Sequence, residues 1–190
     1  NVRSLVVSEA DGILHLSNDF RNPKISTTIP ELAQFLNSYG AITKIAEKHY
    51  RINRPISIEK NVRLDITADT VNKLELSSAP NFGITCLCAE SAEILIKDTA
   101  ITSIDPATNQ PDTTQEDGRS FIRALKSTRM DIIDSDISYL GTGLEALTAG
   151  REQQPILRDG GTYGISWRIS KDTLGQDIAT GWVEGSTFHR

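Results

Sequence analysis

The chain has 190 residues, a mass of 20.9 kDa and a hydrophobic content of 38%, which suit a single domain with a packed core. Its formal net charge of −5 and its pI near 5.2 exclude an overall basic surface of the kind that attracts nucleic acid. No apolar run reaches the length of a membrane span, and the N-terminus carries no signal peptide, although a leader could have been removed before Asn1.

The first stretch of the chain differs from the rest and is predicted to be a unit of strands and one capping helix, residues 1–54. In the segment TTIPELAQFLNSYG, Thr28 and Glu31 have the spacing of a capping box, Pro30 takes the first helical position, and Gly40 follows as a stop. The apolar stripe of this helix is formed by Ile29, Leu32, Phe35 and Leu36. We expect the stripe to cover the open end of a strand stack, and binding of a partner is the alternative.

A spaced apolar pattern recurs four times in residues 55–190. Each copy has two alternate apolar or small residues, four mostly polar residues, and then another apolar residue. The copies are Leu64, Ile66 and Val71; Ile94, Ile96 and Ile101; Met130, Ile132 and Ile137; and Gly181, Val183 and Phe188. This spacing is typical of a strand, a bend and a second strand in one rung of a parallel β-helix. Residues 55–190 are therefore predicted to form parallel β-helix rungs.

The copies are unevenly spaced, and the extra residues are expected in surface loops. Residues 102–120 and 141–162 are rich in Gly, Pro, Thr, Asp and Gln, which favour turns, and long loops cost a stacked fold little. The fourth copy is still in progress at Arg190, so we expect the stack to be truncated at its C-terminal end. An open last rung exposes strand edges and predicts self-association there.

A second family of strands precedes the spaced pattern, at residues 82–88, 121–126 and 163–169. Aligning their central isoleucines as inward residues predicts an inward and an outward set. The inward residues are Ile84 and Cys86, Ile122 and Ala124, and Ile165 and Trp167. The outward residues are Thr85 and Leu87, Arg123 and Leu125, and Ser166 and Arg168.

Three outward residues, Arg123, Ser166 and Arg168, are the candidate substrate-binding residues. The two arginines lie one rung apart and diagonal to each other on an otherwise acidic protein, and neighbouring rungs are about 4.8 Å apart. Arginine suits planar recognition of carboxylates, which indicates an acidic polysaccharide as the ligand. The alternative is that both arginines are ordinary solvated strand residues.

No metal or cofactor site is predicted. Cys86 and Cys88 point to the same side of a strand and are expected to be unpaired, buried thiols, with a C-x-C metal site as the alternative. The histidines His15, His49 and His189 are interpreted as ordinary surface or core residues. The acidic corner residues Asp98, Asp134, Asp136 and Glu184 match no calcium-loop pattern and are interpreted as turn residues.

Trp182 and Tyr163 are expected either to stack on sugars or to pack loops.

Three segments together carry a resemblance to a known family. YGISW at 163–167, DIIDSDISYLG at 131–141 and ATGWVEGSTFH at 179–189, with the preceding helix and strands, resemble the N-terminal half of the mannuronan C5-epimerases of alginate biosynthesis. The resemblance implies a right-handed, single-stranded parallel β-helix of the pectin-lyase-like kind. It also implies a periplasmic or secreted protein that acts on polymannuronate, removing the C5 proton of a uronate and returning one on the opposite face to give guluronate.

The chain departs from this family at the catalytic motif. The family's D-P-H-D signature lies on a strand equivalent to YGISW but about two rungs further on, and no D-P-H-D occurs in the 190 residues. The same place in the rung is taken here by Ser166–Ile169, so no catalytic residue is assigned and this stretch alone is expected to be inactive. A uronate lyase and a non-catalytic β-helix that binds acidic polysaccharide or acts as an adhesin are the alternatives.

Overall fold

The computed structural model describes residues 4–19, 21–78, 85–114, 118–141, 164–168 and 178–189. These residues are mostly in strands, with one α-helix among them, α1 at Ile29–Phe35, and one 3₁₀-helix, η1 at Asn37–Tyr39. The strands form three sheets, which we call sheets A, B and C. The mostly β architecture expected from the sequence is confirmed.

Each sheet collects strands from widely separated parts of the chain. Sheet A contains β1 (Leu5–Ala10), β2 (Ile13–Asn18), β6 (Ile56–Ile58), β9 (Cys86–Glu90), β13 (Phe121–Leu125) and β16 (Ile165–Trp167). Sheet B contains β3 (Ile25–Thr28), β7 (Val62–Thr67), β10 (Glu93–Lys97), β14 (Arg129–Ile133) and β17 (Val183–Glu184). Sheet C contains β4 (Ile42–Ala46), β5 (His49–Ile52), β8 (Lys73–Ser77), β11 (Ala100–Asp105), β15 (Asp136–Ser138) and β18 (Thr187–His189). A short strand, β12 (Gln110–Pro111), pairs with β11.

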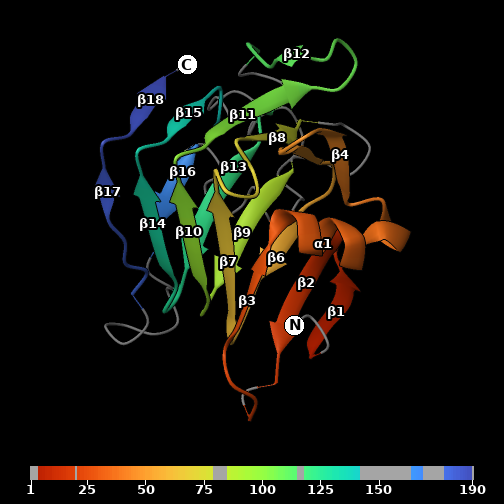
Figure 1. Cartoon of the computed structure of the whole chain (residues 1–190), viewed down its shortest axis with the longest axis vertical. Coiled ribbons are helices and arrows are strands. Elements are labelled where there is room, and N and C mark those ends of the chain that lie inside the picture. The colour runs from red at the N-terminus through yellow and green to blue at the C-terminus, as the bar shows by residue number, and fades with distance from the viewer. Residues whose placement is uncertain are drawn as a thin grey trace.

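The chain visits the sheets in the order A, B, C and then repeats that order (Figure 1). One such passage, for example β6, β7 and β8, is one rung, and strands of neighbouring rungs pair in parallel. Three pairs are antiparallel hairpins instead: β1 with β2, β4 with β5, and β11 with β12. The parallel stacking buries the inward residues of successive rungs against one another, which produces one continuous core.

The recurring apolar pattern predicts the register of sheet B correctly. Ile94 faces Leu64 on one side and Met130 on the other. The second member of each pair aligns in the same way, and Ile132 also faces Val183 of the last rung. The inward members that the first three copies place in sheet B are 0% to 2% exposed, so the alternation found in the sequence marks the core face.

The first copy was assigned a wrong third member. In sheet C, Ile101 faces Leu74 rather than Val71, whereas Ile137 and Phe188 align with Ile101 as expected. The bend after β7 is longer than those after β10 and β14, because the Val71 amide turns back to donate to the Thr67 carbonyl at 2.7 Å. Val71 is still fully buried, but it fills the bend and does not lie in the strand.

Gly181 occupies the first apolar position of the fourth copy for a steric reason. A Cβ atom there would lie 2.0 Å from the Met130 carbonyl oxygen and 2.3 Å from Nε1 of Trp167. The Trp167 indole N–H donates to that same Met130 carbonyl at 3.1 Å. The inward indole therefore fills the space that a side chain at this position would need, which confirms the inward direction predicted for Trp167.

The bends between sheets B and C are built from stacked left-handed residues. Asp98, Asp134 and Gly185 have φ values of 53°, 47° and 58°. The Asp98 amide donates to the Ile133 carbonyl, and the Asp134 amide donates to the Glu184 carbonyl. Aspartate and glycine adopt this conformation more readily than other residues, so a turn role explains these aspartates.

Helix α1 forms as its sequence predicts. The Thr28 Oγ1 accepts from the Glu31 amide, and the Glu31 carboxylate accepts from the Thr28 amide at 2.8 Å, which completes the capping box. Gly40 follows η1 with a φ of 60°. Fully buried Ile29, Leu32 and Leu36 join the main core, where α1 contacts β3, β4 and β7 (Figure 1). The apolar stripe thus packs against the first strands of sheets B and C.

The two long insertions differ from a pair of simple loops. Residues 102–105 continue β11, with Ile104 only 3% exposed, and the chain returns through β12 as a hairpin. The loop expectation for residues 102–120 was therefore wrong at its start, because residues 101–104 are all buried and continue the strand. Of the second insertion only Gly141 belongs to the described residues.

Candidate functional site

The outer face of sheet A carries the three candidate substrate-binding residues. Arg123 of β13 faces Ser166 of β16 in parallel register. The amide of Arg168, just after β16, donates to the Ala124 carbonyl at 2.9 Å, which places Arg168 one step further along the same ladder. The structure therefore brings all three side chains to neighbouring positions of two adjacent rungs.

Strand β9, which pairs with β13 on this face, has a different register from the predicted one. Cys86 faces Phe121, Leu87 faces Ile122, and Cys88 faces Arg123. Leu87 belongs to the main core, whereas Cys86 and Cys88 cluster with Phe121 on the outer face. The prediction that Thr85 and Leu87 point outward and Cys86 inward is wrong, because an odd shift in register exchanges the two faces of a strand. Ile84, on which that alignment depended, lies outside the described residues.

Cys86 and Cys88 form a disulfide. The expectation of unpaired thiols is wrong because the two Cα atoms are 5.6 Å apart, which is inside the usual range for a disulfide. Because the two sulfurs are joined to each other in this structure, neither is available as a thiolate ligand for the C-x-C metal alternative. The disulfide packs beside Phe121 and Ile13 on the outer face of sheet A.

Burial differs among the three candidate residues. Arg123 is only 5% exposed, and its guanidinium carbon lies 5.4 Å from the centre of the Phe121 ring, in cation–π range. Ser166 and Arg168 are half-buried. Arg123 thus lies below the surface, while Ser166 and Arg168 are partly exposed.

Sheet A also carries a histidine in the same outward row. His15 faces Ser57, which in turn faces Cys88. The His15 Nδ1 lies 2.5 Å from the Glu59 carboxylate, and both side chains are 27% exposed. This pairing gives His15 a structural partner at the far end of the row from Ser166.

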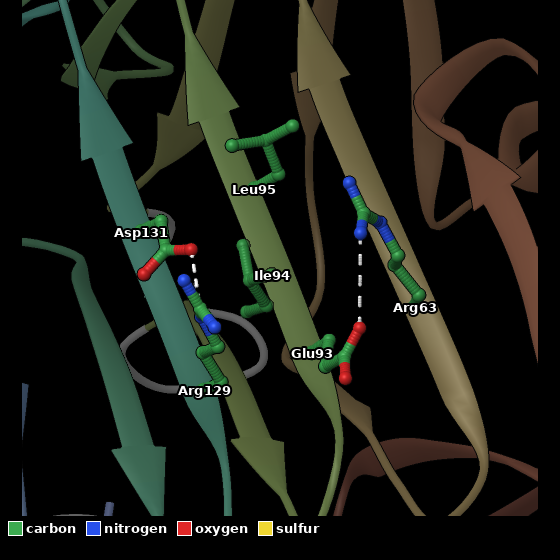
Figure 2. Close-up of a pocket in the computed structure, with 6 residues that line it drawn as sticks. All are labelled: Arg63, Glu93, Ile94, Leu95, Arg129 and Asp131. Atoms are coloured by element: carbon green, nitrogen blue, oxygen red, sulfur yellow. Dashed lines mark hydrogen bonds and ion pairs between the residues drawn. The ribbon is translucent and has the colours of Figure 1, made fainter. Parts of the chain in front are cut away.

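The outer face of sheet B is open and highly charged (Figure 2). A hollow of about 300 Å³ is lined by Arg63 of β7, Glu93 and Leu95 of β10, and Arg129 and Asp131 of β14. Arg63 Nε donates to Asp65 at 2.7 Å, and Arg129 Nε donates to Asp131 at 2.8 Å. The hydrogen bond to Asp65, more than any other contact, raises the pKa of the Arg63 guanidinium.

Trp182 stands next to this hollow. Its backbone amide donates to Asp131 Oδ1 at 3.0 Å, and its indole N–H donates to Glu184 Oε2 at 2.9 Å. The side chain is nevertheless 60% exposed. The hydrogen bond from the indole N–H therefore fixes the position of the ring, while much of Trp182 faces solvent.

Sheet C carries a buried carboxylate with three basic neighbours. The Glu75 side chain is 3% exposed and lies 2.9 Å from His49 Nε2, 2.8 Å from Arg51 Nε and 3.0 Å from Lys73 Nζ. Burial raises the pKa of the Glu75 carboxyl, but the hydrogen bonds from Lys73, Arg51 and His49 outweigh burial and lower it below its ordinary value. At the end of the same sheet, His189 Nε2 lies 2.5 Å from Asp136 Oδ1.

The last described rung ends in a second, apolar hollow of about 410 Å³. It is lined by Ile137, Leu140, Gly164, Ile165, Trp167, Val183, Phe188 and His189. Val183 and Phe188 are 47% and 49% exposed, although they align with buried residues of the rung below. Their exposure follows from their place on the outermost strands of sheets B and C.

Sequence reasoning missed the hollow on sheet B. The signal was present as Arg-Leu-Asp at 63–65 and Arg-Met-Asp at 129–131, which fall at the same place in two copies of the pattern. Only the apolar middle residue of each triplet was used to find the rungs. The flanking Arg and Asp point to the opposite face, where they build the hollow.

Within the described ranges, no three His, Cys, Asp or Glu side chains come together in a group that could hold a metal ion. None of the helices in those ranges is long and apolar enough to cross a membrane.

The fold is the one adopted by alginate epimerases of known structure. No family model matches the chain, and no curated protein matches it. The chain is similar to a solved structure of the periplasmic alginate epimerase AlgG, with a TM-score of 0.69 and 16% identity. A single-site mutant of AlgG matches with a TM-score of 0.70 at 16% identity, and a double mutant with 0.66 at 14%. In each case the match covers 93% of this chain and 37% of the AlgG chain. The chain therefore spans little more than a third of the length of the structures it resembles.

Proposed function

We propose that the chain is a right-handed, single-stranded parallel β-helix and that it forms the N-terminal part of a mannuronan C5-epimerase. The observation that carries this proposal is the likeness in fold to AlgG, an alginate epimerase, over 93% of the chain. The stacked parallel strands and the helix that packs at their start fit the same architecture. The periplasm, where AlgG resides by its name, is the proposed location.

The proposed role of this part of the protein is to hold the acidic polymer. The proton at C5 of a uronate lies next to a carboxylate, so a site that removes it must first neutralise that carboxylate. Arg168 and Ser166 are the accessible groups for this on sheet A, and the buried charge of Arg123 supports them from below. The D-P-H-D signature is absent from these 190 residues, so the proposal assigns the groups that move the proton to the longer protein.

Binding of trimannuronate to the chain tests this role. Arg168→Ala removes a charge-assisted hydrogen bond worth about 1.5 to 3 kcal/mol, so the affinity should fall at least tenfold. Arg21→Ala is the matched control, because Arg21 is exposed in the turn after β2 and pairs with Asp19. Equal trimannuronate affinities for the two variants and the parent chain would remove the proposed subsite.

The reaction is tested on a longer protein that contains this chain. Polymannuronate incubated with it in heavy water should exchange its C5 hydrogen and gain guluronate, both visible by NMR. Unsaturated chain ends without guluronate would indicate a lyase. Binding without exchange or unsaturated ends would indicate a non-catalytic polysaccharide-binding β-helix.

We also propose that the chain, when isolated, associates with itself through the apolar hollow at its last rung. Exposed Phe188 and Val183 support this, and so do β17 and β18, which are edge strands among the described residues, because edge strands pair with other strands. Sedimentation should show dimers or larger species that dissociate on dilution, and Phe188→Asp should shift the distribution to monomer. A monomer at all concentrations would contradict the proposal.

A further inference from the structure

We propose that the hollow on sheet B, between Arg63 and Arg129, is a binding site for a neutral, hydroxyl-rich sugar. This site is separate from the uronate-binding face proposed on sheet A. It is lined by Arg63 of β7, by Glu93 and Leu95 of β10, and by Arg129 and Asp131 of β14 (Figure 2).

The two Arg–Asp pairs are equivalent in the fold. Arg63 and Arg129 both face Glu93, and Asp65 and Asp131 both face Leu95. The pairs lie two rungs apart, which separates them by roughly 10 Å. Each pair presents guanidinium donors beside carboxylate acceptors, an arrangement that can accept and donate hydrogen bonds to neighbouring hydroxyls of a sugar ring.

The charges around the hollow balance, and this determines the class of ligand. Arg63 and Arg129 are each neutralised by the aspartate two residues further along the same strand. Glu93 adds a carboxylate, which lies 2.5 Å from Lys24 Nζ and 3.8 Å from the Arg63 guanidinium. A uronate carboxylate would meet three carboxylates already paired with the available cations, so an uncharged sugar fits better than an acidic one.

Apolar surface for a sugar ring is present in the same place. Leu95 is half-buried at the centre of the hollow, between Asp65 and Asp131, and offers a contact for the C–H groups of the ring. Trp182, on the neighbouring rung, is fixed to Asp131 through its amide and to Glu184 through its indole N–H. Because Trp182 is 60% exposed, its indole can stack against an adjoining sugar unit.

Titration with neutral trisaccharides tests the site on the complete 190-residue chain. Mannotriose, cellotriose and galactotriose are added separately to isotope-labelled protein, and the indole N–H resonance of Trp182 and the backbone amide resonances of Leu95 and Asp131 are followed by NMR. We expect at least one of them to shift these resonances with saturation in the millimolar range. Asp131→Asn and Trp182→Ala should each weaken that binding about tenfold, whereas Glu47→Gln, in an exposed ion pair on sheet C, should leave it unchanged.

Three outcomes would overturn the proposal. The first is that none of the three trisaccharides produces a saturable shift. The second is that Asp131→Asn and Trp182→Ala bind the active trisaccharide as tightly as Glu47→Gln does. In the third, trimannuronate displaces the neutral sugar, so that the hollow belongs to the uronate-binding face. The uronate proposal stands apart from these outcomes, because it depends on Arg168→Ala and trimannuronate.

Discussion

The outer faces of sheets A and B are built from the same alternation of residues, yet the middle of the sheet A face is closed whereas the sheet B face is open. On sheet A the outward residues Cys86, Phe121 and Arg123 are at most 5% exposed. On sheet B the outward Arg129 and Trp182 are exposed; Arg129 is paired with Asp131, and the Trp182 indole N–H donates to Glu184. The direction of a side chain on a strand therefore does not fix its exposure, because the outer face of a solenoid can carry a packed layer of its own.

The largest expected contrast between the two faces is in stability. Phe121→Ala removes a fully buried ring from the outer layer of sheet A and should lower the free energy of unfolding by about 4 kcal/mol. Leu95→Ala, on the open face of sheet B, should lower it by about 0.5 kcal/mol. Urea denaturation followed by circular dichroism measures both. Similar losses for the two variants would show that sheet A has no packed outer layer.

Sheet C sharpens the comparison because it combines burial with charge. Glu75→Gln leaves Arg51 and Lys73 without their buried carboxylate and should cost about 3 kcal/mol of stability at neutral pH. The folded pKa of Glu75 is lowered, so its contribution is complete above the unfolded glutamate value of about 4.3 and is lost as the pH falls through the folded value. The difference in unfolding free energy between parent and variant should shrink in acid, and a difference independent of pH would contradict this role.

The disulfide on sheet A is expected to contribute less than Phe121. It closes a very short loop, from Cys86 to Cys88, so the loss of chain entropy accounts for about 1 to 2 kcal/mol. Thermal unfolding with and without a thiol reductant should show this decrease, and a Cys86→Ser, Cys88→Ser double variant should reproduce it. Thermal unfolding that is unchanged by the reductant would mean that the pair is not joined in the native fold.

The smallest effect is expected for the ion pairs of sheet B. Arg129→Ala removes the partner of Asp131 at an exposed position and should change the free energy of unfolding by less than about 1 kcal/mol. High salt should reduce even this difference. A loss as large as that of Phe121→Ala would show that the hollow is structural and would leave little reason to assign it a ligand.

Much of the core could be predicted from the sequence, because the same inward residues recur at each rung. Ile94, Ile96 and Ile132 were placed correctly by their alternation alone. The register of β9 could not be predicted in the same way. Both faces of CLCAE are buried, so apolar residues occupy inward and outward positions alike and the alternation carries no information about direction.

The candidate sites differ in how far the sequence could reveal them. The neighbouring positions of Arg123 and Ser166 followed from aligning two strands, and the structure confirms that pairing. The depth of Arg123 did not follow, because it depends on packing with Phe121 across the outer face. The hollow on sheet B depends on polar residues that lie between the apolar ones, and a search for apolar periodicity passes over them.

The most direct test of the proposed division between the two faces is one NMR titration of the isotope-labelled chain with trimannuronate. The proposals predict saturable shifts of the amides of β13 and β16, centred on Ser166 and Arg168, while the indole N–H of Trp182 stays in place. Shifts confined to Trp182 and the strands of sheet B, or no saturable shift in β13 and β16, would contradict the uronate-binding face and with it the proposed role of this chain in an alginate epimerase.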